Sequence, residues 1–176
     1  MLRNQQLIAL AALLALPAAG LAQTSTTQSF SAQARVHQIP ITLTVNDNLE
    51  LGEFAPWGVG GWIAIHPLGT PASSGDNVTI SSQGSPGRFT VTGTPHLPFT
   101  IVLPPSDRSA FVSNTTGTPG SIMVIEYFFS SYDENGTSPI LNASGTASFT
   151  LGAKLLVNPN QHPGVYTGSF PLTVAY

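Results

Sequence analysis

The four histidines are the side chains best able to bind a metal ion or transfer protons, and each stands alone in the sequence. None has a second histidine, a cysteine or a glutamate at a spacing that binds zinc. We therefore predict that they occupy strand edges and turns rather than a metal site. They are His37, His66, His96 and His162.

Two close acidic pairs could hold calcium weakly, because this ion prefers carboxylate oxygens. Asp47 lies near Glu50, and Asp133 adjoins Glu134. Neither pair has the spacing of an EF-hand loop, and both fall in polar stretches. Solvated turn acids are the favoured interpretation, so neither a metal nor a cofactor is expected.

Motifs for nucleophilic or phosphate chemistry are absent from the sequence. There is no Gly-x-Ser-x-Gly segment, and the glycine run at 58–61 lacks the lysine and hydroxyl residue of a phosphate loop. This favours a protein that is not an enzyme. Trp57 and Trp62 flank the glycine run and could stack against a sugar, although packing aromatics are the favoured interpretation.

Composition narrows the class of protein further. Charged residues make up 7% of the chain, and there are only five lysines and arginines, so the clustered cations of a nucleic-acid-binding protein are missing. There are 17 glycines and 15 prolines, and no segment keeps a helical period. Both features favour an all-β fold with many turns. The chain has no cysteine and therefore no disulfide.

The N-terminus is typical of a secretory signal peptide. Arg3 precedes the apolar run LIALAALLAL (7–16), which is too short to span a bilayer, and Pro17 follows it. Small residues before position 23 predict cleavage after Ala22. We expect residues 1–22 to be removed on export, with no later transmembrane segment.

Short runs of alternating apolar residues, bounded by glycine and proline, predict about eight or nine strands in one β-sandwich. The sequence at 106–120 is interpreted as a polar loop, and DENG (133–136) as a hairpin turn. The expected strands lie near 30–45, interrupted at Pro40, and near 49–54, 60–65, 78–80, 88–93, 99–103, 121–132, 146–157 and 164–176.

The last strand carries the strongest pattern, because apolar residues occupy every second position up to the end of the chain. A period of two points these side chains to one face of a strand. They are Tyr166, Phe170, Leu172, Val174 and Tyr176. We expect most of them to be buried with Phe149, Leu151 and Leu155 of the preceding strand, which should be its antiparallel neighbour. Such an apolar edge needs a partner or a cover.

The segment after the expected cleavage site also alternates. Phe30, Ala32, Ala34 and Val36 share one face, and polar residues lie between them. This pattern predicts a half-buried strand that lies directly behind a polar leader. The sequence leaves open whether that strand pairs with its own domain or with another subunit.

Four blocks resemble a family of secreted bacterial pilin-like domains without an assigned function, similar in pattern to the spore-coat-protein-U-type pilins of archaic chaperone–usher pili. Three blocks are NLELGEF (48–54), GGWIAIHP (60–67) and RFTVTG (88–93). The most specific is the tail, FTLGAKLLV (149–157) and then NQHPGVYTGSFPLTVAY (160–176). One departure is Leu51, where the family has phenylalanine before Gly52.

The resemblance implies an incomplete immunoglobulin-like antiparallel β-sandwich, at 39–176, whose groove borders the C-terminal strand. Residues 23–38 would be an N-terminal extension, and Phe30, Ala32, Ala34 and Val36 would form its donor strand. A periplasmic chaperone would fill the groove first, and the next subunit's extension would then replace it, with an outer-membrane usher assisting.

The expected function is therefore a structural subunit of a surface filament or fimbria-like homopolymer. It would pass through the periplasm to the cell surface or medium. The alternative is a monomeric secreted module for carbohydrate binding or adhesion that uses Trp57 and Trp62.

Overall fold

A computed structural model describes residues 26–69, 72–75 and 77–176 of the chain. The chain divides into two units, Met1–Val36 and His37–Tyr176. The predicted signal peptide lies outside the described residues. In the first unit, residues 26–36 form neither helix nor strand, and the side chains of Phe30 and Val36 are 92% and 96% exposed. The expected half-buried strand is therefore wrong for this single chain.

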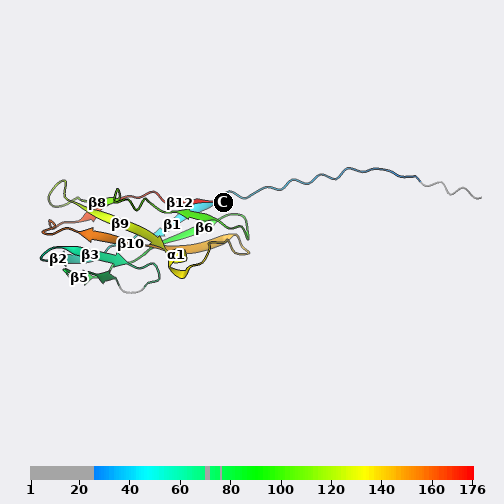
Figure 1. Cartoon of the computed structure of the whole chain (residues 1–176). Helices are drawn as coiled ribbons and strands as arrows, with labels where there is room; N and C mark the ends of the chain where they lie inside the picture. Colours follow the sequence, from blue (N-terminus) through cyan, green and yellow to red (C-terminus); the bar gives the residue numbers. More distant parts are fainter. Residues whose placement is uncertain (1–25, 70–71, 76) are drawn as a thin grey trace, which may run out of the picture. The chain divides into compact units, whose positions relative to one another are not determined.

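The second unit is nearly all β, with one short helix, α1 (Ser131–Asn135), in the described part of the chain (Figure 1). The strands are β1 (Thr42–Asp47), β2 (Glu53–Pro56), β3 (Gly61–Ile65), β4 (Ser73–Ser74), β5 (Val78–Ser82), β6 (Gly87–Thr92), β7 (Thr100–Val102), β8 (Phe111–Asn114), β9 (Ile122–Ser130), β10 (Thr146–Val157), β11 (Tyr166–Thr167) and β12 (Thr173–Ala175).

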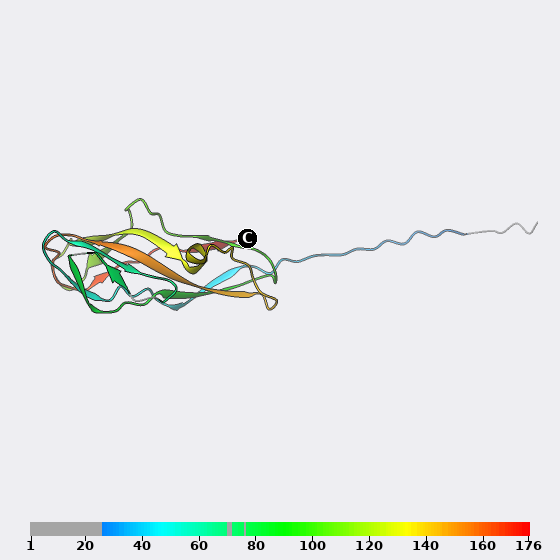
Figure 2. The ribbon, with the colours of Figure 1, turned by 60° about the horizontal axis from the view of Figure 1, so that its bottom comes forward.

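The long strand β10 organises the main sheet. One edge of β10 pairs with β6 through its first half and with β3 through its second half, and the other edge pairs with β9. The complete order is β1-β6-β10-β9-β8-β11, and β4 extends β3. Every pairing is antiparallel, and the sheets curl into a half-barrel. Figure 2 shows β9 and β10 running together through the middle of this unit.

Two small sheets accompany the main one: β12 with β7, and β2 with β5. The core between the sheets is apolar, and its alternation follows the strands. On β10, Phe149, Leu151 and Leu155 are buried as predicted. Phe89 stacks on Phe149 with ring centroids 5.2 Å apart, because the two residues are direct cross-strand partners. The all-β, sandwich-like fold class is confirmed.

Two local predictions are wrong. The stretch expected as a loop at 106–120 contains β8, whose Val112 is buried whereas the adjacent Phe111 is 49% exposed. The expected hairpin turn at 133–136 is the helix α1. The Ser130 side chain accepts a hydrogen bond from the Asp133 amide to cap this helix, and Gly136 ends it in the left-handed conformation at φ 62°. The capping residues therefore stabilise a helix at a place where the Asn-Gly pair had predicted a hairpin turn.

The C-terminal strand also differs from its prediction. It is divided into β11, which pairs with β8, and β12, which pairs with β7, so it is not a neighbour of β10. The alternation itself holds, but its residues are half-buried rather than buried. The half-buried side chains are Tyr166, Phe170, Leu172 and Val174, and Tyr176 is 41% exposed.

Candidate functional site

The main structural feature with functional potential is a pair of free strand edges. Within the described residues, β1 pairs only with β6, and β12 pairs only with β7. The two strands approach each other without forming a ladder between them. Figures 1 and 2 both place the red C-terminal strand near the cyan β1. Each strand thus presents unpaired backbone groups along one edge.

The inward-facing side chains of β1 are only partly covered by the rest of the core. Val45 is the cross-strand partner of Phe89, so the two side chains point to the same face of the sheet. Phe89 is 8% exposed, yet Val45 is 56% exposed. Leu43 lies opposite the fully buried Val91 and is itself only half-buried. The inward face of the sheet therefore becomes open to solvent at β1.

The β12 edge is apolar and half-covered in the same way. Val174 lies opposite Ile101 of β7, and both side chains are half-buried against the core. Leu172 and Phe170 precede β12, and the Phe170 ring centroid is 5.0 Å from that of the buried Phe128. The predicted C-terminal residues thus form the half-covered margin of the core.

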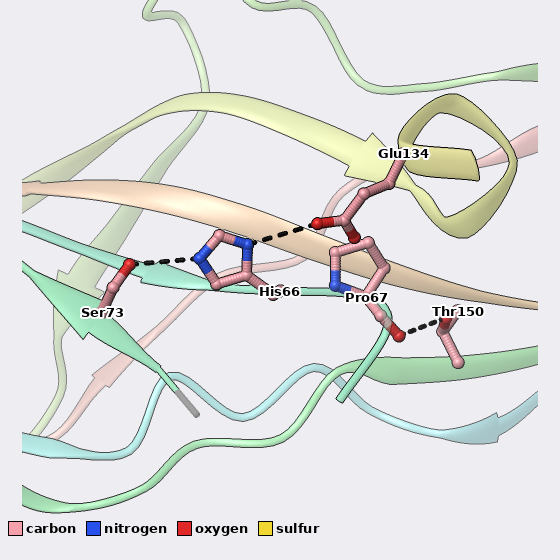
Figure 3. Close-up of polar contacts among 5 residues, drawn as sticks. All are labelled: His66, Pro67, Ser73, Glu134 and Thr150. Atoms are coloured by element: carbon pink, nitrogen blue, oxygen red, sulfur yellow. Dashed lines mark hydrogen bonds and ion pairs between the residues drawn. The ribbon is translucent and has the colours of Figure 1, made fainter. Parts of the chain in front are cut away.

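A serine–histidine–glutamate cluster lies elsewhere, at the junction of β3, β4 and α1 (Figure 3). His66 Nε2 is 3.1 Å from Ser73 Oγ, and His66 Nδ1 is 3.5 Å from Glu134 Oε1. The His66 and Phe129 rings pack in a T-shaped arrangement with their centroids 5.9 Å apart. This order of groups is the one used to activate a serine nucleophile.

Among the described residues, the backbone amides near Ser73 do not complete such a centre. Acyl transfer needs backbone N–H donors free to bind the developing oxyanion. The amide of Ala72 already donates to Gln83 Oε1 at 2.7 Å, and that of Gly75 donates to the Trp62 carbonyl at 2.9 Å. The cluster therefore acts best as a tie between β4, the end of β3 and α1. Thr150 adds to it by donating to the Pro67 carbonyl at 2.6 Å.

A second polar cluster covers the outer face of β9 and β10. Lys154 Nζ lies 2.9 Å from Glu126 Oε2 and 4.9 Å from the centroid of the Trp62 ring. The hydrogen bond with Lys154 holds the pKa of the Glu126 carboxyl below its ordinary value, and the same bond raises the pKa of Lys154. Glu126 reaches this position because a bulge in β9 adds one residue there.

The two tryptophans therefore have different environments. Trp62 has the Lys154 ammonium over its ring, and the backbone at Gly75 packs closely against its indole nitrogen. Trp57 is 62% exposed, and its amide donates to the Asn77 carbonyl at 2.9 Å. Of the pair, Trp57 is the side chain with an accessible ring.

The acidic pairs and the remaining histidines are not brought together. Asp47 forms an exposed ion pair with Arg88 at 3.6 Å, and Asp133 belongs to the cap of α1. In the described parts of the chain, no three residues with metal-binding side chains form a group. No helix among the described residues is long and apolar enough to cross a membrane.

Sequence reasoning missed the His66 cluster because Glu134 is distant from His66 along the chain and no motif spacing links the two. It also missed the contribution of β1 to the open margin. The odd-position alternation of Leu43 and Val45 was visible, but an uncovered inward face becomes evident only once Val45 and Phe89 are known to be cross-strand partners.

These features define an all-β, sandwich-like unit in which, among other edge strands, β1 and β12 each leave one half-covered edge unpaired. The chain belongs to the family described as Domain of unknown function (DUF4402), whose model matches residues 41–176. No curated protein and no solved structure matches the chain. The similarity to spore-coat-protein-U-type pilins therefore stays a prediction.

Proposed function

We propose that this protein is the structural subunit of an exported bacterial filament, and that its subunits join by strand complementation. An N-terminal arm at 23–38 from one subunit adds to the free edges of β1 and β12 in the next. A periplasmic chaperone and an outer-membrane usher are the partners expected to deliver it to the cell surface. No step of this function requires a cofactor or an enzymatic reaction.

The observation that carries the proposal is the contrast between Val45 and Phe89. Both face inward, but only Phe89 is covered. A side chain on the core face of a sandwich is normally covered by the opposing layer. An added strand along β1 and β12 would supply that cover and would satisfy the unpaired edge amides and carbonyls.

The arm has the chemistry that such an edge accepts. Phe30, Ala32, Ala34 and Val36 alternate with polar residues, so an extended arm presents one apolar face. Phe30 and Val36 are almost fully exposed in the single chain, and covering them would contribute hydrophobic free energy. The arm and the β1–β12 margin are therefore two exposed apolar surfaces that could cover each other.

A monomeric carbohydrate-binding or adhesion module remains the second candidate, and the exposed ring of Trp57 is the observation in its favour. Lys154 already lies over the ring of Trp62, which leaves the module with less aromatic surface than the sequence suggested. A glycan array with the Trp57→Ala variant would separate this candidate from the filament subunit.

The test of the proposal places one negative charge on either face of the arm. In the exported chain, Ala34→Asp should abolish concentration-dependent polymers, because an unpaired carboxylate would be buried along the acceptor edge. The matched control, Gln33→Asp, adds the same charge on the polar face and should leave polymers intact. Analytical ultracentrifugation measures both.

Equal polymerisation of the two variants would rule out the arm as the joining element. A loss of polymers in both would point to a general charge effect instead of a buried face, and would equally contradict the proposal.

A further inference from the structure

The C-terminal residue joins the two free edges at one end. The Tyr176 hydroxyl donates a hydrogen bond to the Ile39 carbonyl at 2.9 Å and accepts one from the Thr94 amide. Ile39 lies just before β1, Thr94 lies just after β6, and Tyr176 directly follows β12. One phenol group therefore bridges from the β12 side to the β1–β6 side.

The surrounding residues hold this contact in place. The Ile39 amide donates to Thr94 Oγ1 at 2.8 Å, which fixes the chain immediately before Pro40 and β1. Gly93 is buried, and a Cβ at this position would overlap the Tyr176 hydroxyl. The sequence thus leaves space for the phenol group by omitting a side chain. We call Ile39, Gly93, Thr94 and Tyr176 the edge clasp.

The edge clasp lies at a defined end of both strands. β12 runs toward it and stops there, whereas β1 starts beside it and runs away. The free edges are thus bridged at this end, and the edge of β1 remains open toward Asp47. A strand that adds along β12 meets the phenol group at the end of its path.

We propose that Tyr176 is a positioning residue which sets the register of the incoming arm. The inference rests on the proposed function. Backbone hydrogen bonds repeat every two residues along a strand, so they do not by themselves select one register. A slip of two residues would keep the apolar face inward but would move Phe30 into the place meant for Ala32. A fixed stop at one end removes that ambiguity.

The chain offers a matched control for the hydroxyl. Tyr166 on β11 also forms hydrogen bonds through its phenol oxygen: it donates to the His162 carbonyl at 2.7 Å and contacts Ser121 Oγ at 2.9 Å. Both residues sit on the same C-terminal segment, and both lose only an oxygen on substitution by phenylalanine. Tyr166 does not belong to the edge clasp, so its variant controls for the general effect of losing a hydroxyl.

The experiment uses the full exported chain with Ala34→Asp, whose own arm is thereby unable to compete. A synthetic peptide of residues 26–38 carries a nitroxide at one end, and NMR line broadening maps the amides near it. We expect one broadening pattern on the parent chain and on its Tyr166→Phe variant. The Tyr176→Phe variant should give two or more patterns, because the arm is then no longer held in a single register.

An unchanged single pattern with Tyr176→Phe would overturn the positioning role while leaving strand addition intact. Failure of the peptide to bind the parent chain would instead reject the proposed function, and the positioning role with it. If circular dichroism shows that Tyr176→Phe does not fold, Thr94→Val is used instead, because it removes both hydrogen bonds between the Thr94 hydroxyl and Ile39 and keeps the tyrosine. With this variant, several broadening patterns would support the positioning role of the edge clasp, and a single pattern would overturn it.

Discussion

The exposure of single side chains shows where the core is covered and where it is open to solvent. Phe89 and Val45 point to one face from neighbouring strands and differ sevenfold in exposure, 8% against 56%. Such a difference between cross-strand partners arises at a sheet margin where the opposing layer stops. The same margin includes Val174 and Leu172, which are only half-buried although their alternation is that of a core strand.

At the residue scale, the Lys154–Glu126 pair predicts a pH dependence of stability. The pKa of Glu126 is lowered from 4.5 in the folded chain, so its charge stabilises the fold above that value. This stabilisation is lost as the pH falls through the folded pKa. Urea denaturation should show that Glu126→Gln costs about 0.5–1 kcal/mol at pH 6 and a smaller amount at pH 3.

The exposed Glu53→Gln variant serves as the control for removing a negative charge from a strand. A cost for Glu126→Gln that is the same at both pH values would show that the pair does not titrate as proposed.

At the scale of elements, the C-terminal segment is the part that the sequence predicted least well. Its period of two correctly indicated which residues point inward. Pairing partners were not predictable, because β7 and β8 are short, polar or flanked by prolines, and β8 was hidden in a stretch that resembles a loop. The long strand β10 was predicted from its unbroken alternation at 146–157.

Half-burial of the C-terminal segment predicts a graded cost of truncation. Phe149→Ala on β10 should cost about 3–5 kcal/mol, the range for a fully buried phenylalanine. Phe170→Ala removes a half-buried ring that contacts Phe128, and should cost about 2 kcal/mol. Denaturant unfolding of both variants measures the difference. A Phe170→Ala cost at or below about 0.5 kcal/mol would mean that this segment is not part of the core margin.

At the scale of the whole molecule, the composition predicted an all-β fold without disulfides, and the structure has that fold. The sequence also indicated the two features on which the functional hypothesis rests, an alternating arm and an apolar last strand. The free edge of β1 and the edge clasp could not be predicted from the sequence, because both depend on the order of the strands in the sheet. The clasp brings together Ile39, Thr94 and Tyr176 from three separate parts of the chain.

The central claim is that the donor strand at 28–37, within the arm at 23–38, completes the open margin of a sandwich. The most direct measurement uses the chain that begins at Gln23 and appends a second copy of residues 28–37 to Tyr176 through a short turn linker. If the claim holds, sedimentation should show a monomer that no longer polymerises, and its thermal midpoint should rise above that of the chain with Ala34→Asp. A graft that itself carries Ala34→Asp should give neither effect. Continued polymerisation with an unchanged thermal midpoint in the unmodified graft would contradict the account.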